Sequence, residues 1–267
     1  MKLMYITNSP GIATVAENAG VDRIFVDMEY MGKQERQGGM DTVQSHHTVE
    51  DVQNIRRAVR TADLLVRCNP VHEATEQELE AIIDAGADII MLPYFKTVEE
   101  VRIFLDIVKG RVKTCLLLET PEAAESVDEI LSLPGIDEVH IGLNDLSLGY
   151  GRKFMFELLA DGTVEMLCRK CAQRGIPYGF GGIASLGKGM LHSEYIIKEH
   201  YRLGSQCAIL SRSFCDVSRI EDMDRIKTIF SRGVRAIREF EQHCLAHPET
   251  YEENRLEVVR LVEEFAE

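Results

Sequence analysis

Residues 79–93 read Leu-Glu-Ala-Ile-Ile-Asp-Ala-Gly-Ala-Asp-Ile-Ile-Met-Leu-Pro and contain the unit from which the chain is built. A helical pattern over residues 76–85 ends at Gly86, and an apolar run over residues 89–92 follows it directly. Glycine commonly ends a helix because it adopts the left-handed conformation at no steric cost, and a short apolar run between turn signals is typical of a buried strand. The stretch therefore predicts a helix followed by a buried strand.

The same alternation continues through most of the chain. Helical patterns start at Thr48 (residues 49–60), at Thr97 (to Lys109, before Gly110) and at Thr120, which precedes a proline. Strands separated by helices pair in parallel, and eight such units in about 215 residues predict a (β/α)8 TIM barrel. An open doubly wound sheet is the alternative. The predicted strands are residues 2–6, 23–27, 64–67, 89–92, 114–119, 138–141, 177–180 and 207–210.

The composition is that of an ordinary globular protein. The 267 residues are 45% hydrophobic and 28% charged, which is enough apolar material for a large core. The formal net charge of −14 argues against a nucleic-acid partner, because phosphate backbones require a basic surface. The first residues become polar too quickly for a signal peptide, and no apolar run approaches the length of a membrane span. We expect a cytoplasmic protein with no membrane attachment.

The seven cysteines are scattered and odd in number, which favours reduced thiols over a disulfide framework. Cys168 and Cys171 form a single Cys-x-x-Cys pair inside a helical pattern. A zinc or redox site would need a second pair of ligands or a different setting. Packing within the helix is the simpler interpretation of the pair.

Two segments depart from the repeat. Residues 219–267 are predicted to form a helical C-terminal extension after a catalytic barrel domain of residues 1–218. Its apolar face must be covered, either by its own barrel or by a neighbouring subunit. The other segment, residues 30–47, is a polar loop much longer than an ordinary connection, and such loops often carry function. The face of the extension comprises Ile226, Ile229, Phe230, Val234, Ile237 and Phe240.

Charged residues gather where the predicted strands end. In a barrel, the carboxyl ends of the strands surround one shared site, so side chains distant in sequence become neighbours. Carboxylates without nearby cysteines or a calcium-loop pattern suit Mg²⁺ or Mn²⁺. Glu119 and Asp145 are the candidate ligands, with a helix cap or a structural ion pair as the alternative for each. The residues brought together are Asp27, Glu29, Arg67, Glu119 and Asp145.

Asp27 and Glu29 are two residues apart and can face the same side. They are candidates to hold water on the metal or to hydrogen bond to the groups that bind it.

Several of these stretches resemble one known family. The order, spacing and residue types of four stretches resemble those of the HpcH/HpaI aldolase (citrate lyase β-type) family. The stretches are Val66-Arg67, residues 79–93, residues 118–124 and residues 130–147. The resemblance spans roughly residues 1–215. It implies a (β/α)8 barrel, a divalent metal, and reversible cleavage of a hydroxy-keto acid to pyruvate and an aldehyde. It also implies a homo-oligomer, a hexamer or a dimer, in which subunits exchange a C-terminal helix.

Carried onto this sequence, the resemblance makes Glu119 and Asp145 the metal ligands and Arg67 the cation that contacts the keto oxygen of an oxo-acid substrate. Metal and Arg67 would together stabilise the enolate that appears when the carbon–carbon bond breaks. A lysine Schiff base is the rival mechanism, and Lys96 is its best candidate, although a solvated loop charge is the simpler role. A citrate-lyase-like cleavage of an acyl thioester and a non-catalytic barrel that binds an oxo-acid are the alternative functions.

The chain departs from the family pattern at the expected general base. Many members have His in an Asp-x-Glu-His step, whereas this chain has Tyr30, and tyrosine is a weak base at neutral pH. His46 and His47, at the end of the long loop, are the candidates to replace it, unless they are solvated residues before the Thr48 cap.

Two further departures concern the walls of the site. Leu143 stands where the family often has proline, and residues 109–113 lack the family's Pro-Pro-x-Gly-x-Arg-Gly segment. The substrate therefore cannot be copied from the family. The glycine-rich loop after the seventh strand suggests a phosphate cradle formed with Gly181, Gly182 and Ser211, with a tight turn as the alternative.

Overall fold

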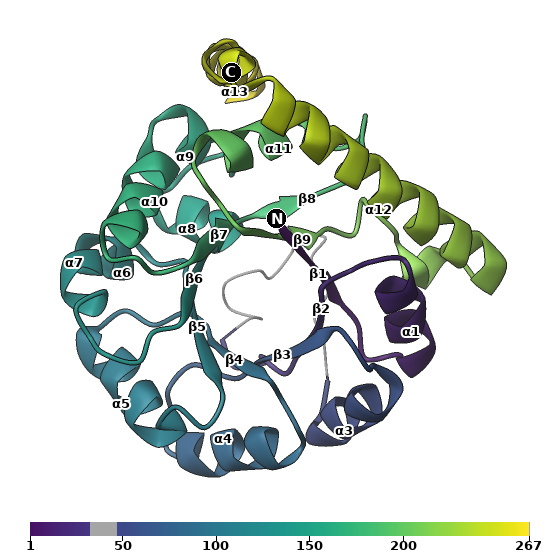
Figure 1. Cartoon of the computed structure of the whole chain (residues 1–267). Coiled ribbons are helices and arrows are strands. Elements are labelled where there is room, and N and C mark those ends of the chain that lie inside the picture. Colours follow the sequence, from purple (N-terminus) through teal and green to yellow (C-terminus); the bar gives the residue numbers. More distant parts are fainter. Residues whose placement is uncertain (33–46, 267) are drawn as a thin grey trace.

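The computed structural model describes residues 1–32 and 47–266, and its strands form one parallel sheet (Figure 1). The strand order is β7-β6-β5-β4-β3-β2-β1-β9-β8. The strands are β1 (Lys2–Ile6), β2 (Arg23–Asp27), β3 (Asp63–Arg67), β4 (Ile89–Leu92), β5 (Lys113–Leu118), β6 (Glu138–Ile141), β7 (Tyr178–Phe180), β8 (Gly182–Ile183) and β9 (Cys207–Leu210). The predicted strands are confirmed to within a residue at most ends.

The sheet closes on itself because β7 and β8 are two pieces of one strand, broken at Gly181. Gly181 has a φ of +49°, and a Cβ there would lie 2.7 Å from Leu143. The Gln206 N–H donates to Tyr178 O at 2.7 Å, which links the segment before β9 back to β7. The predicted (β/α)8 TIM barrel is therefore confirmed, with its seventh strand divided.

Helices surround the barrel on its outside (Figure 1). Thr48 and Thr97 form reciprocal capping boxes at the starts of α3 and α5, as expected for a threonine followed three residues later by an acid. Thr120 caps α6, with Pro121 at the first helical position. The predicted helix starts are therefore confirmed.

Among the described residues, the outer helices before the extension are α1 (Pro10–Asn18), α3 (Val49–Ala58), α4 (Thr75–Asp84), α5 (Val98–Val108), α6 (Pro121–Glu125), α7 (Val127–Ile130), α8 (Leu143–Gly149), α9 (Glu157–Ala160), α10 (Thr163–Gln173) and α11 (Ser193–Arg202).

Alternation along each strand divides the core in two. One set of strand side chains points outward to the helices, and the other fills the barrel. The barrel interior is lined by Met4, Phe25, Leu65, Ile89, Met91, Cys115, Leu117 and Cys207. Because side chains fill the interior, the barrel is not an open channel. A binding site is therefore expected at the carboxyl ends of the strands.

The C-terminal segment folds back on its own barrel. α12 (Met223–Ala246) contacts both α1 and α11, and the Phe230 ring meets the Tyr5 ring edge-on with centroids 4.8 Å apart. α13 (Tyr251–Ala266) then packs against α9 and α11. The apolar face of α12 is therefore covered within the chain, which is one of the two predicted alternatives. The interface role of the extension stays a prediction.

None of the helices in the described residues combines the length and apolar character that a membrane span requires. Cys168 and Cys171 are both buried on α10, and burial raises the pKa of the Cys171 thiol to about 12. This setting agrees with a packing role for the pair.

Candidate active site

Arg67 ends β3 and lies beside Asp27, its neighbour in the β2–β3 register. Its Nε and Nη2 donate to the two carboxylate oxygens of Asp27, each at 2.8 Å, and Nε lies 3.3 Å from Oε2 of Glu29. Two parallel hydrogen bonds fix the plane of a guanidinium as well as its position. The strand register and the Asp-x-Glu spacing therefore hold one cation rigidly at the carboxyl end of the barrel.

The acids around Arg67 keep it charged. Burial acts to lower the pKa of the Arg67 guanidinium, but the carboxylates of Asp27, Glu29 and Glu119 outweigh burial and raise it above the ordinary value. The side chain is 15% exposed, so part of it reaches the surface of the site. Arg67 is thus a permanent, oriented cation.

Glu119 directly follows β5 and is buried. Its Oε1 accepts the backbone N–H of Tyr94 at 3.1 Å, and its Oε2 would lie 2.7 Å from a Cβ added at Gly142. Gly142 directly follows β6, and its missing side chain makes room for the carboxylate. Two neighbouring strand ends therefore determine where the Glu119 side chain lies.

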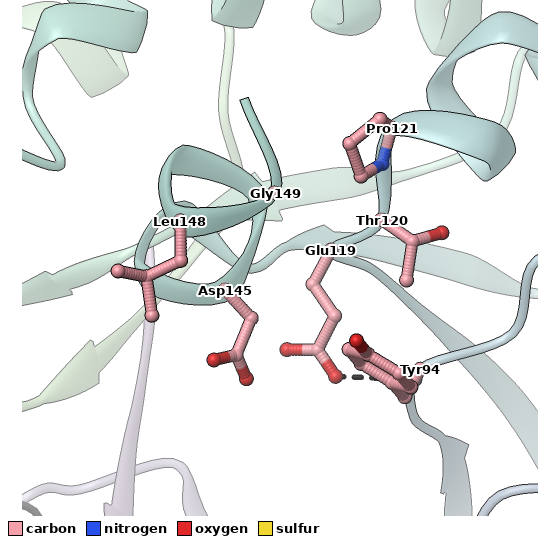
Figure 2. Close-up of a pocket in the computed structure, with 7 residues that line it drawn as sticks. All are labelled: Tyr94, Glu119, Thr120, Pro121, Asp145, Leu148 and Gly149. Carbon is pink, nitrogen blue, oxygen red and sulfur yellow. Dashed lines mark hydrogen bonds between the residues drawn. The ribbon is translucent and has the colours of Figure 1, made fainter. Parts of the chain in front are cut away.

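Asp145 lies in the first turn of α8, which follows β6. Its carboxylate and that of Glu119 turn toward the same space, as Figure 2 shows. Both line a pocket of about 200 Å³, together with Tyr94, Thr120, Pro121, Leu148 and Gly149. Gly149 permits this packing, because a Cβ there would lie 2.5 Å from the Pro121 ring.

The donor set suits a hard divalent cation. Four carboxylates accompany one guanidinium at this end of the barrel, and two of the carboxylates share the pocket. Mg²⁺ is typically held by one or two carboxylates plus water, so Glu119 and Asp145 fit that cation. Within residues 1–32 and 47–266, no group of three or more His, Cys, Asp or Glu side chains has the arrangement of a metal site.

The structure places the candidate bases differently. His46 lies outside the described residues. His47 lies beside β2, where its Nδ1 accepts the backbone N–H of Asp27 at 2.9 Å. Tyr30 follows Glu29, and its side chain is 63% exposed. Of these residues, His47 is therefore the one in direct contact with the acidic strand end.

The glycine-rich loop uses its backbone groups within the fold. The Gly181 N–H donates to Ile141 O at 2.9 Å, and Gly181 O accepts from Ile209 N and lies 3.1 Å from Nε2 of His140. Gly182 belongs to β8, and the Ser211 N–H donates to Ile183 O. These contacts agree with the turn alternative for Gly181 and leave its N–H engaged.

Three site features had not been predicted from the sequence. Tyr94 and Leu148 line the pocket, and Asn69 accepts the backbone N–H groups of Tyr30 and Met31 at 3.0 and 3.1 Å. Proximity to a predicted strand end was the available signal for Tyr94 and Asn69. Lys96, the Schiff-base candidate, lies 3.2 Å from Glu122 and is half exposed, which agrees with a loop charge.

The comparisons with known proteins decide the family. A family model described as HpcH/HpaI aldolase/citrate lyase matches residues 2–158, more than half of the chain. The chain belongs to this family. Membership of the HpcH/HpaI family supports a lyase or aldolase activity. The matched segment contains Asp27, Arg67, Glu119 and Asp145.

Solved structures of HpcH/HpaI proteins share the fold. An HpcH/HpaI aldolase from Desulfitobacterium hafniense DCB-2 aligns with a TM-score of 0.62 at 18% identity, covering 89% of this chain and 93% of that one. An HpcH/HpaI aldolase/citrate lyase family protein from Burkholderia cenocepacia J2315 aligns with a TM-score of 0.61 at 17% identity, covering 91% and 93%. A search of the curated proteins found no match.

Proposed function

We propose that this protein is a divalent-metal-dependent aldolase of the class II pyruvate type, which cleaves a hydroxy-keto acid to pyruvate, or a related oxo-acid, and an aldehyde. One observation carries the proposal. An oriented, permanently charged Arg67 lies close enough to Glu119 to be influenced by its charge, and Glu119 shares a pocket with Asp145. Carboxylates that can bind a metal ion, near a fixed guanidinium, suit metal-assisted carbon–carbon cleavage beside a carbonyl.

Glu119 and Asp145 would hold the cation, with Mg²⁺ and Mn²⁺ the best matches to their oxygen donors. When bound, such a cation polarises the substrate carbonyl as a Lewis acid. Glu119 is already held by the Tyr94 N–H, so its carboxylate is oriented before the substrate arrives.

Arg67 stabilises the charge that develops during cleavage. When the carbon–carbon bond breaks, its electron pair moves onto the oxo-acid fragment, and the keto oxygen becomes that of an enolate. The guanidinium donates to that oxygen while Asp27 and Glu29 keep its plane fixed. A donor oriented in advance in a partly buried site loses little energy to reorganisation.

His47 is in direct contact with the strand end that holds the partner of Arg67. Its Nδ1 accepts the Asp27 N–H, and a neutral imidazole with an accepting Nδ1 carries its proton on Nε2. The hydrogen bond to Nδ1 ties residue 47 to the strand that holds Asp27. His46 and His47 stay the candidates to take the substrate hydroxyl proton.

We also propose a cytoplasmic homo-oligomer that takes an oxo-acid as its small-molecule partner. All seven cysteines are free and buried, which suits a reducing compartment.

The decisive experiment detects enolisation without knowledge of the aldehyde. NMR would follow deuterium exchange into the methyl group of pyruvate with Mg²⁺ or Mn²⁺ and again with chelator. We expect metal-dependent exchange that is lost in Glu119→Gln and kept in Glu122→Gln, whose parent residue pairs with Lys96 instead. Absence of exchange in the metal-loaded wild type would refute the pyruvate aldolase and favour the thioester lyase or the binder.

A further inference from the structure

Tyr94 has a backbone conformation that is unusual for its residue type. Among the described residues, Tyr94 and Lys109 are the non-glycine residues with positive φ, at 48° and 49°. Lys109 is the C-cap of α5, where the left-handed conformation is ordinary. Tyr94 follows β4 and caps no helix. Non-glycine residues adopt this conformation at a cost, and such residues cluster at functional sites.

Neighbouring contacts hold Tyr94 in that conformation. The next residue, Phe95, is 1% exposed, and its carbonyl accepts the Thr120 hydroxyl at 2.7 Å. The Tyr94 N–H points to Glu119 Oε1. The turn thus places one ring in the core and one N–H on the candidate ligand, and it sends the Tyr94 ring to the pocket.

The Tyr94 ring forms part of an apolar wall. It lines the pocket together with the Pro121 ring and the Leu148 side chain, and Figure 2 shows it beside the Glu119 carboxylate. The two carboxylates occupy the polar part of the same pocket. When the oxo-acid part of the substrate is held at the carboxylates, the rest of the substrate lies against this apolar wall.

We propose that Tyr94 determines specificity for the aldehyde half of the substrate, with Leu148 and Pro121 completing a surface that takes a small uncharged aldehyde. The inference rests on the proposed function and names the substrate class of that same site. In addition, the oxo-acid methyl carbon loses a proton and bonds to the aldehyde carbon, while the electron pair of the aldehyde carbonyl moves to its oxygen, which takes up a proton. In cleavage, the hydroxyl loses that proton as the carbon–carbon bond breaks, and the enolate carbon takes up a proton to give the methyl group.

The charges around the wall favour an uncharged aldehyde. Of the residues that the structure describes, those lining the pocket include two carboxylates and no lysine or arginine. Lys96 lies over the Tyr94 ring at 5.5 Å, but its ammonium pairs with Glu122 at 3.2 Å. A phosphate or carboxylate on the aldehyde would therefore find no dedicated cation among the described residues of this wall.

The test separates the two halves of the reaction. Exchange of the pyruvate methyl protons reports the oxo-acid half, and addition of pyruvate to propanal, glycolaldehyde, D-glyceraldehyde and its 3-phosphate reports the aldehyde half. For Tyr94→Ala we expect KM for the uncharged aldehydes to rise about tenfold or more, while exchange changes by less than about threefold. Tyr94→Phe keeps the aromatic ring, so its KM for the aldehydes and its exchange rate should both stay near the wild-type values.

Two further variants provide a second test of the apolar wall and a control. Leu148→Ala should show the same split and serves if Tyr94→Ala fails to fold, and Tyr195→Ala, at a half-buried tyrosine on α11, is the matched control. Equal loss of exchange and addition in Tyr94→Ala, or no change in either, would overturn the inference while leaving the proposed function intact. A wild type that prefers the phosphorylated aldehyde would also overturn it. A wild type that exchanges no protons overturns the proposed function, and this inference with it.

Discussion

Two arginines that pair with carboxylates lie at opposite ends of the same barrel, one buried and one partly exposed. Arg23, at the start of β2, donates to both oxygens of Glu138 at 2.5 and 2.9 Å, and Arg67, at the end of β3, donates to both oxygens of Asp27 at 2.8 Å. The Arg23 side chain is 1% exposed, whereas Arg67 is 15% exposed. The pairs use the same chemistry in different surroundings.

The difference teaches what turns an ion pair into a candidate site. Arg23 has one close carboxylate, with Asp63 more distant at 3.6 Å, and this end of the barrel is filled by side chains. Arg67 has two close carboxylates and lies near Glu119, which lines a pocket. Arg67 therefore differs from Arg23 in having more than one nearby carboxylate and a pocket beside them. We expect Arg23 to contribute to stability and Arg67 to contribute to catalysis.

The largest expected effect is on catalysis at the pocket end. Arg67→Ala should lower the rate of pyruvate methyl exchange by about 10³-fold, because it removes the donor to the developing oxyanion. Arg67→Lys, which keeps the charge and loses the two-pronged geometry, should retain part of the rate. Exchange kinetics by NMR measure both, and near wild-type exchange in Arg67→Ala would remove this residue from the mechanism.

At the closed end, the expected effect is on stability. Glu138→Gln should lower the free energy of unfolding by about 3 kcal/mol, because Arg23 remains buried without its carboxylate. Exchange activity of the folded variant should stay near wild type. Denaturant unfolding measures the change, and Glu80→Gln, which breaks the exposed pair with Arg111, is a control that should matter far less. Equal losses of unfolding free energy in Glu138→Gln and Glu80→Gln would contradict the stabilising role assigned to the buried Arg23 pair.

A third prediction concerns the space between the two arginines. Burial lowers the pKa of His140 to about 4, with smaller contributions from Arg23 and Arg67, while its hydrogen bond to Gly181 O opposes them. The unfolded chain therefore binds the proton more readily than the native one below pH 6.5. Stability should be full above about pH 6.5 and fall as the pH drops toward 4.

The expected loss from His140 is about 2 kcal/mol between pH 7 and 5. His140→Gln, unfolded by denaturant over this pH range, should show a shallower dependence. His200 is also buried with a lowered pKa, so the dependence should become shallower rather than vanish. An unchanged slope in His140→Gln would mean that His140 is not the source.

The smallest expected effect tests how the strand ends position a ligand. Gly142 has a φ of −82°, which alanine also adopts, so Gly142→Ala acts only through its Cβ, 2.7 Å from Glu119 Oε2. Displacing that carboxylate should weaken Mn²⁺ binding about tenfold. Calorimetric titration measures it, with Gly11→Ala as the control, because a Cβ there would make only ordinary contacts at 3.9 Å. Unchanged Mn²⁺ affinity in Gly142→Ala would show that metal binding does not depend on the contact between Gly142 and Glu119.

Local sequence signals were enough for most of the architecture. Gly86 and Pro93 bound the apolar run of β4, and the Thr48, Thr97 and Thr120 caps start helices where the sequence indicates. Because strand ends in a barrel meet, the Asp27–Arg67 contact also followed from the predicted strand limits.

Features that depend on distant neighbours had not been predicted. The break at Gly181 depends on Leu143, and the turn at Tyr94 depends on Glu119, 25 residues away. No local window contains both partners of such a contact. The helix after Thr120 also ends early at Glu125, and a second short helix, α7, follows it.

The pairing of β1 with β9 has a consequence for how the chain folds. Met4 pairs with Ile209, so the barrel closes only after a loop of about two hundred residues has been brought together. Until then β1 presents an unpaired edge, to which the edge of another chain can add. Every candidate catalytic residue from Asp27 to Asp145 precedes that closing strand. We therefore expect closure to be a late and slow step, during which aggregation competes with folding.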